Sequence, residues 1–132
     1  MARDLASRAH DAGVVPVLMV GGAGVHTCSE AASDAHRADL VTNLVATMDD
    51  YGFDGLDLDW EPIAEEDRPS LRALAEDLRV ASPGIVLTIP LGWVNANFPT
   101  VDVSYAEIAP LFDQVNLMTY SMAGPWSGWQ SW

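Results

Sequence analysis

The segment FDGLDLDWEP at residues 53–62 places four carboxylates within eight positions of an apolar stretch. Side chains of a β-strand alternate between its two faces, so Asp57, Asp59 and Glu61 should project from one face and apolar side chains from the other. Three like charges side by side repel one another and lose hydration, so packing alone does not select them. A carboxyl group with carboxylate neighbours can gain a raised pKa, which suits a proton donor. The row therefore predicts acid–base chemistry, whereas Asp54, of opposite parity, is expected to be structural.

Two alternative roles for this segment fit less well. A solvated acidic edge is disfavoured by the leucines between the acids. A calcium loop of the EF-hand type needs a central glycine and polar residues between its ligands, whereas Leu58 and Trp60 occupy such positions here. The sequence favours a catalytic row over a charged surface or a cation-binding loop.

The spacing D-x-x-D-x-D-x-E over residues 54–61 resembles the signature of glycoside hydrolase family 18, the chitinases and their relatives. Two weaker matches flank it in the expected order. LMVGG at residues 18–22 is similar to the S-x-G-G segment that ends the third barrel strand of the family, and QVNLMTY at residues 114–120 is similar to the end of the sixth. The resemblance covers about residues 14–132, nearly the whole chain.

The resemblance implies retaining hydrolysis of β-1,4-linked N-acetylglucosamine without an enzyme nucleophile, an exception to the usual two-carboxylate scheme. Glu61 would protonate the glycosidic oxygen while the acetamido carbonyl of the substrate attacks the anomeric carbon. Asp59 would hold the acetamido N–H and stabilise the oxazolinium ion, and Asp57 would share a proton with Asp59 and help to reset Glu61. The spacing agrees in part, because residues i and i+2 lie roughly 7 Å apart on one face of a strand.

The resemblance also implies substrate-binding residues outside this row. Tyr120 would hold the acetamido oxygen, Met118 would line the floor beneath the sugar, and Gly22 belongs to the matched glycine segment. The chain departs from the family pattern at two positions. Ser121 stands where Asp is common, which removes a charge beside the tyrosine, and Met19 replaces the serine of S-x-G-G, which removes a hydrogen-bonding group expected to support the carboxylate row.

Two tryptophans are further candidates for contacts with a sugar. Trp93 follows a predicted strand, and Trp126 lies in the tail GPWSGWQSW. Apolar sugar faces stack on flat aromatic surfaces, and exposed tryptophans are otherwise costly. Each could instead pack against other parts of a barrel, and Tyr120 could be an ordinary buried tyrosine with a satisfied hydroxyl. The sequence leaves these alternatives open.

Two cofactor motifs are incomplete. His26, Cys28 and Glu30 could bind a metal, but the sequence has no second ligand cluster to complete the site. VGGAGVH follows a predicted strand as dinucleotide-binding loops do, yet Thr27 stands where the third glycine of G-x-G-x-x-G would fall. We therefore expect neither a metal nor a cofactor.

The composition limits the partners of the protein. The chain has 132 residues, 49% of them hydrophobic, with a formal net charge of −13. Nucleic acids and anionic membranes need basic surface, so neither is expected to bind. No apolar run approaches the roughly 18 residues of a membrane span, and residues 1–13 show no secretion signal. The family resemblance nevertheless implies an extracellular location, and the single cysteine, Cys28, leaves the compartment open.

The hydrophobic pattern predicts strands that alternate with helices. Helices are expected at residues 2–12, 34–50 (with Ser33 as N-cap), 68–81 and 105–111, and strands at residues 14–20, 53–60, 85–91 and 114–119. Such alternation is typical of an α/β fold with a parallel sheet. The carboxyl ends of its strands, where sites form, would gather Gly21, Glu61, Trp93 and Tyr120.

Four strands are half of a (β/α)8 TIM barrel, which takes roughly 200 residues or more. We therefore expect residues 1–132 to form one domain that holds the third to sixth strands of a partial barrel, as a half-barrel or a piece of a longer chain. Its exposed strand edges favour self-association. The expected function is that of a chitinase, with endo-type cleavage favoured; a non-catalytic chitin-binding relative and an inactive half-barrel are the alternatives.

Overall fold

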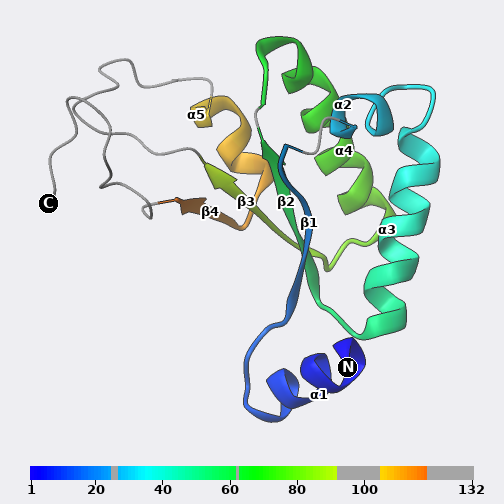
Figure 1. The fold of residues 1–132 in the computed structure, drawn as a ribbon, viewed down its shortest axis with the longest axis vertical. Helices are drawn as coiled ribbons and strands as arrows, with labels where there is room; N and C mark the ends of the chain where they lie inside the picture. Colours follow the sequence, from blue (N-terminus) through cyan, green and yellow to red (C-terminus); the bar gives the residue numbers. More distant parts are fainter. Residues whose placement is uncertain (25–26, 62, 92–104, 119–132) are drawn as a thin grey trace, which may run out of the picture.

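The chain folds into a four-stranded parallel sheet with helices in the connections (Figure 1). This computed structural model describes residues 1–24, 27–61, 63–91 and 105–118. The strands follow one another in the sheet in chain order: β1 (Val17–Ala23), β2 (Gly55–Glu61), β3 (Val86–Leu91) and β4 (Gln114–Leu117). The helices are α1 (Ala2–Asp11), α2 (Cys28–Ala31), α3 (Arg37–Tyr51), α4 (Arg68–Ala81) and α5 (Tyr105–Ile108), with 3-10 turns η1 (Glu65–Asp67) and η2 (Ala109–Leu111). The predicted α/β architecture is confirmed.

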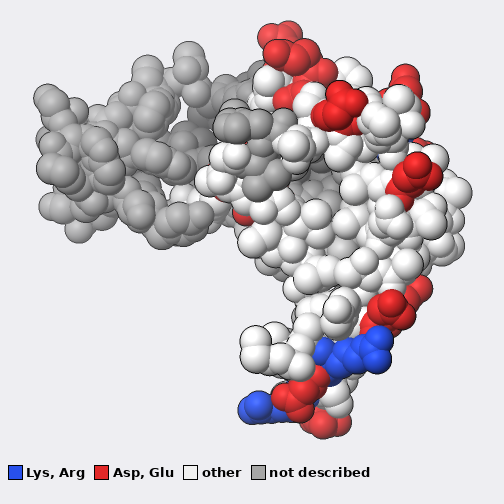
Figure 2. All heavy atoms as spheres, turned by 45° about the vertical axis from the view of Figure 1, so that its right-hand side comes forward, with Lys and Arg blue, Asp and Glu red and all other residues white. Residues whose placement is uncertain are grey.

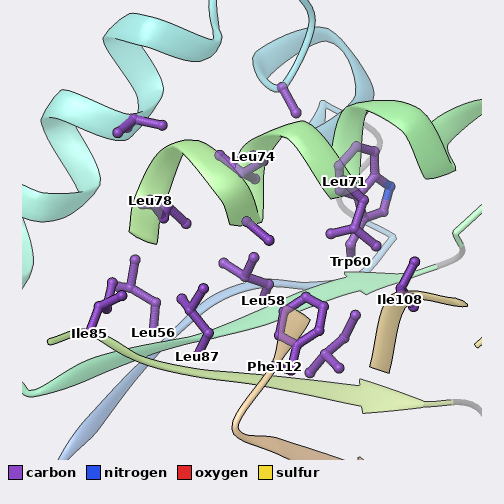
Figure 3. Close-up of a cluster of buried hydrophobic side chains, with 14 of the residues drawn as sticks. Leu56, Leu58, Trp60, Leu71, Leu74, Leu78, Ile85, Leu87, Ile108 and Phe112 are labelled. Carbon is purple, nitrogen blue, oxygen red and sulfur yellow. The ribbon is translucent and has the colours of Figure 1, made fainter. Parts of the chain in front are cut away.

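One face of the sheet is covered by helices and forms the hydrophobic core. Figure 3 shows the side chains of Leu56, Leu58 and Trp60 on β2 pointing toward α4. Leu71 and Leu78 of α4 are fully buried against this face. Helix α4 has its apolar residues at a spacing of three and four positions, which gives it one buried stripe. The core therefore fixes which face of β2 points away from the helices.

The opposite face carries the carboxylate row. Parallel pairing places Met19, Asp57, Thr88 and Gln114 side by side across the four strands. The next row on this face contains Gly21, Asp59 and Asn116, beside Pro90. Within the described residues, β1 and β4 each pair with one strand only, so both outer edges of the sheet are unpaired.

Several predicted boundaries need correction. The strand expected at residues 14–20 is β1, Val17–Ala23, and it runs through the glycines instead of ending before them. Val14 and Val15 are more than half exposed and lie outside the strand, and Pro16 has no N–H to donate to a neighbour. The Pro16 carbonyl accepts a hydrogen bond from the Asp54 N–H at 2.9 Å, which aligns the two chains just before β1 and β2 begin.

The region before α3 differs most from the prediction. Helix α2 was not predicted, and α3 begins at Arg37 instead of residue 34. Ser33 does not cap α3, because its hydroxyl donates to the Glu30 carbonyl at 2.7 Å. Helix α3 ends at Gly52, which has a positive φ of 75° as a left-handed cap requires. The other two long connections are close to expectation, since α4 matches residues 68–81 and the segment 105–111 divides into α5 and η2.

Acidic side chains dominate the described surface. Figure 2 shows them spread over the face on which the helices lie, whereas the basic side chains visible in this view gather at its lower end, at the level of α1. This distribution agrees with the net charge of −13. Among the described residues, none of the helices combines the length and the apolar character that crossing a membrane would need.

Candidate active site

The candidate site lies at the carboxyl end of β2. Asp57, Asp59 and Glu61 alternate with Leu56, Leu58 and Trp60, as the pattern predicts, and all three carboxylates are half-buried. The strand begins at Gly55, where a Cβ atom would lie 2.1 Å from the Val86 carbonyl oxygen. Glycine therefore lets β2 and β3 approach closely at the amino end, and the carboxylates follow toward the end at which parallel sheets form their sites.

Glu61 has the electrostatics of a proton donor. Burial in the site is the largest cause that raises the pKa of its carboxyl group, followed by the negative charge of Asp59 and a hydrogen bond with the Asp59 side chain. Each of these favours the protonated form. The raised pKa that the sequence predicted for the end of the row is thus present in the structure.

Asp59 is held close to β1. Gly21 has a φ of 113°, and a Cβ atom there would lie 2.1 Å from the Asp59 carbonyl oxygen, so only glycine fits. The Oδ1 atom of Asp59 is buried and has no hydrogen-bond partner among the described residues. Buried carboxylate oxygens are normally paired, so this atom is suited to accept a hydrogen bond from a bound ligand.

Asp57 lies one step deeper in the row and has a partner that the sequence pattern did not predict. The Thr88 hydroxyl on β3 donates a hydrogen bond to its Oδ1 atom. Asp57 and Thr88 are directly paired in the parallel register, and Thr88 is 5% exposed. A polar residue inside an apolar strand is the sequence signal that could have predicted this partner. VLTIPL at residues 86–91 contains one hydroxyl side chain, that of Thr88.

A cavity of about 380 Å³ lies at the Glu61 end of the row. It is lined by Ala23, Gly24, Trp60, Glu61, Ile63, Pro90, Tyr105 and Met118. The structure therefore brings together Glu61 and Met118, both predicted from sequence. Trp60 also lines the cavity, although its side chain was expected on the opposite face only. It is 7% exposed and also forms a wall of an apolar cavity between the sheet and α3.

The remaining predicted contacts fall in two groups. Gly22 is paired with Trp60 and is not among the residues that line the cavity; a Cβ atom at Gly22 would lie 4.0 Å from Asp59 Oδ2. Tyr120, Trp93 and Trp126 lie outside the described residues, as does Ser121. The structure therefore gives no contact for these four.

The cluster weighed as a metal site contains Cys28 in α2. Burial, with smaller contributions from the charges of Asp67 and Asp59, raises the pKa of its thiol, which disfavours the thiolate that metals bind. Within the described part of the chain, no three His, Cys, Asp or Glu side chains are arranged to hold a metal ion. The Asp67 carboxylate, whose charge acts on Cys28, accepts hydrogen bonds from the Ser29 hydroxyl at 2.6 Å and the Ala64 N–H at 3.3 Å. It thereby joins α2 to the loop after β2.

Comparison with known proteins agrees with this geometry. A family profile described as "Glycosyl hydrolases family 18" matches residues 2–131. The chain belongs to glycosyl hydrolase family 18. The acidic row on β2 and the four parallel strands are therefore part of a family 18 barrel, as the resemblance predicted.

The relatives are chitinases that are longer than this chain. Chitinase B of Serratia marcescens is 41% identical over 105 residues, which are 70% of this chain and 21% of that protein. A protein named "Probable endochitinase" from Caenorhabditis elegans is 33% identical over 106 residues, 74% of this chain and 17% of the relative. The chain thus spans about a fifth of the length of these curated relatives.

Solved structures share the fold. Catalytic domain 2 of the Group II chitinase of Ostrinia furnacalis superposes with a TM-score of 0.77 at 25% identity, covering 95% of this chain and 36% of that one. A family 18 chitinase from Cycas revoluta, solved in complex with (GlcNAc)3, gives a TM-score of 0.75 at 27% identity, covering 95% of this chain and 42% of that one. Both are larger barrels that contain the four-stranded unit seen here.

Proposed function

We propose that this chain carries the acid-bearing part of a chitinase site, which cleaves β-1,4-linked N-acetylglucosamine polymers with retention and with help from the substrate. Glu61 acts as the general acid. Asp59 accepts a hydrogen bond from the acetamido N–H and stabilises the oxazolinium ion. Asp57 shares a proton with Asp59 and helps to reset Glu61. The observation that carries the proposal is the row itself: the pKa of the Glu61 carboxyl is raised beside Asp59, and Glu61 lines a cavity of about 380 Å³.

The buried Oδ1 atom of Asp59 supports the assignment of its role. It lacks a hydrogen-bond partner among the described residues, and an acetamido N–H is a donor that could supply one. A carboxyl group that is hydrogen-bonded to Glu61 and has an unpaired second oxygen can orient a substrate amide without serving as a nucleophile. Met118 lines the same cavity, and in this proposal it forms the floor beneath the sugar. Tyr120, Trp93, Trp126 and Gly22 remain proposed substrate contacts on the family pattern alone.

The substrate class follows from the relatives. The Cycas revoluta enzyme was solved with (GlcNAc)3, and the names of some curated relatives include endochitinase. We therefore infer that the protein takes N-acetylglucosamine oligomers and cleaves within them. Because a long polysaccharide does not enter a cell, we also infer that the enzyme acts outside the cell.

The decisive experiment is Glu61→Gln in the protein expressed from its whole reading frame. Loss of a positioned proton donor should lower the rate of chitin-oligomer hydrolysis about 10²–10⁴-fold. Binding of the oligomer, measured by calorimetry, should largely survive because the amide has the shape of the acid. Glu66→Gln is the matched control, since Glu66 is exposed in η1. Near-normal turnover by Glu61→Gln would remove Glu61 from the mechanism, and binding without turnover in the unmodified protein would identify a non-catalytic chitin-binding relative.

The route of the reaction has its own test. If the acetamido group of the substrate is the nucleophile, products keep their anomeric configuration and N-deacetylated oligomers are not cleaved at the deacetylated position. Proton NMR of the fresh products distinguishes retention from inversion. A covalent sugar ester on Asp59, detected by mass spectrometry, would show instead that the enzyme supplies the nucleophile.

We propose further that the 132-residue chain by itself associates or is poorly stable, and has little chitinase activity. Edges of β1 and β4 are unpaired in the described part of the chain, and unpaired edges favour pairing with another strand. A two-fold axis along the barrel direction would keep all strands parallel while β4 of one copy pairs with β1 of the next. Light scattering and an oligomer assay test this: a stable, fully active monomer would contradict it.

A further inference from the structure

Asp57 has a different neighbour on each side in the sheet. On β1 the register partner is Met19, which is 55% exposed and has no hydrogen-bond donor in its side chain. On β3 the partner is Thr88, which is 5% exposed and whose hydroxyl donates to Asp57 Oδ1. We propose that Thr88 is a positioning residue for the carboxylate row, because it holds Asp57 in the orientation from which Asp57 acts on Asp59. The inference rests on the proposed function of the row.

The side chain of Thr88 is well suited to fix a carboxylate. Its β-branched Cβ restricts χ1, so burial in the centre of the sheet leaves the hydroxyl little freedom. Thr88 and Asp67 are the two buried polar or charged residues of the described part of the chain, and a buried hydroxyl without a partner would be costly. The carboxylate is that partner. The contact therefore orders both groups at once.

Thr88 acts at a distance from the substrate. Neither Asp57 nor Thr88 lines the cavity that contains Glu61. Losing the hydroxyl should therefore disturb the proton sharing between Asp57 and Asp59 while leaving the sugar contacts in place. The expected signature is a fall in kcat with little change in KM at an unchanged melting temperature. The melting temperature is needed because a loss of folded protein would also lower the apparent kcat without changing KM.

Two variants and a control test this assignment. Thr88→Val removes the hydroxyl at nearly constant shape and should lower kcat about 10–100-fold, the range expected for a hydrogen bond to a charged group. KM for the oligomer should stay within about twofold. Thr88→Ser keeps the donor and should retain most of the activity. Thr42→Val removes a hydroxyl that donates to the Ala38 carbonyl on the exposed side of α3, and should leave kcat unchanged.

The register offers a second way to restore the contact. Met19 faces Asp57 from the other neighbouring strand, so Met19→Ser in the Thr88→Val background supplies a hydroxyl from β1. Partial recovery of kcat in the double variant is expected. Wild-type kcat in Thr88→Val, or Thr88→Ser no better than Thr88→Val, would overturn the assignment.

A measurement without turnover separates this inference from the proposed function. With labelled aspartate, the carboxyl carbon resonance of Asp57 should move in Thr88→Val and return toward its original position in Thr88→Ser, at constant pH. Thr42→Val should not move it. If the unmodified protein hydrolyses no chitin oligomer, the proposed function is wrong, yet this resonance still decides whether Thr88 holds Asp57; an unmoved resonance in Thr88→Val would refute the contact.

Discussion

The two faces of the sheet differ in their effect on stability: one buries apolar side chains and the other carries carboxylates. On the helix-covered face, Leu56 and Leu87 are fully buried, and each contributes hydrophobic stabilisation. On the open face, the neighbouring positions Asp57, Asp59 and Glu61 crowd like charges into a partly buried row. The first arrangement lowers the free energy of the fold, and the second raises it. The comparison teaches that the apolar face supplies the stability that keeps an unfavourable row of acids in place.

The two ends of the sheet differ as well. At the amino end, Arg79 of α4 donates to the Leu111 carbonyl at 2.8 and 3.0 Å and to Asp113 Oδ2 at 3.0 Å. Asp113 also accepts from the Leu87 N–H at 2.9 Å. At the carboxyl end, Asp59 keeps an unpaired oxygen among the described residues. The carboxylate of Asp113 is thus paired where strands begin, whereas one oxygen of Asp59 has no partner among the described residues where the site forms.

The largest change in stability is expected where β1 meets the acid row. Gly21→Ala places a Cβ atom 2.1 Å from the Asp59 carbonyl oxygen at a φ of 113°. Strain of about 1–3 kcal/mol and overpacking of similar size should together lower the free energy of unfolding by about 2–6 kcal/mol. Urea denaturation measures it. Gly13→Ala is the control, because its φ is also positive but nothing lies within 4 Å, so about 1–2 kcal/mol is expected. Equal losses in the two variants would show that β1 can move away from Asp59.

The next largest change compares the two faces directly. Leu56→Ala empties a fully buried position and should cost about 2–5 kcal/mol. Met19→Ala, on the open face of the adjacent strand, should change stability by less than about 0.5 kcal/mol. Denaturation curves of both variants decide the matter. A comparable loss in Met19→Ala would mean that the open face is packed against other protein in solution.

A smaller effect is expected at the amino end of the sheet. Arg79→Met keeps the apolar stem but removes the hydrogen bonds to Leu111 and Asp113, and should cost about 1–2 kcal/mol. Arg72→Met is the control, since Arg72 makes one hydrogen bond to the Glu107 carbonyl and a long 3.8 Å ion pair with Glu76, and should cost less than about 1 kcal/mol. Thermal unfolding of the two variants gives the comparison. A larger loss of stability in Arg72→Met would show that Arg72, not Arg79, makes the more stabilising contacts of α4.

The smallest effect is a difference in the sign of the pH dependence of stability. It distinguishes Glu61, at the carboxyl end of the sheet, from Asp113, at its amino end. Burial and Asp59 raise the pKa of Glu61, so its ionised form disfavours folding at neutral pH and this cost fades as pH falls through the raised pKa. The Leu87 N–H and Arg79 lower the pKa of Asp113, so its stabilisation is present at neutral pH and is lost as pH falls through the lowered pKa.

Melting curves from pH 7 down to acid, which bracket the ordinary carboxyl range, test these signs. Glu61→Gln should be slightly more stable than the unmodified protein at neutral pH, and Asp113→Asn less stable. Both differences should shrink in acid. A loss of stability in Glu61→Gln at neutral pH would mean that the acid row is not under electrostatic strain.

Much of this molecule follows from local sequence patterns. The alternation in residues 55–61 determined which side chains share a face, because the period of a strand is two. The bounds of helix α4 agree with its sequence pattern, since its apolar spacing and Pro69 near its start are local signals. Gly52 after α3 is a local signal of the same kind, because a left-handed cap needs glycine.

Other features are set by neighbours that the sequence does not reveal. Val14 and Val15 have strand-like side chains but no strand to pair with, because β2 begins at the level of Val17. Ser33 looks like a helix cap, yet the unpredicted α2 directs its hydroxyl to Glu30. In both cases tertiary context overrides a local preference.

The sequence by itself determined the chemistry of the row: three carboxylates on one face of a buried strand, ending in Glu61. Only the tertiary structure decided what each carboxylate touches. Thr88 lies beside Asp57, Gly21 lies against the backbone of Asp59, and Met118 shares a cavity with Glu61. These partners come from other strands, and the register between parallel strands is fixed by the packing of the whole sheet, not by any pattern within one strand.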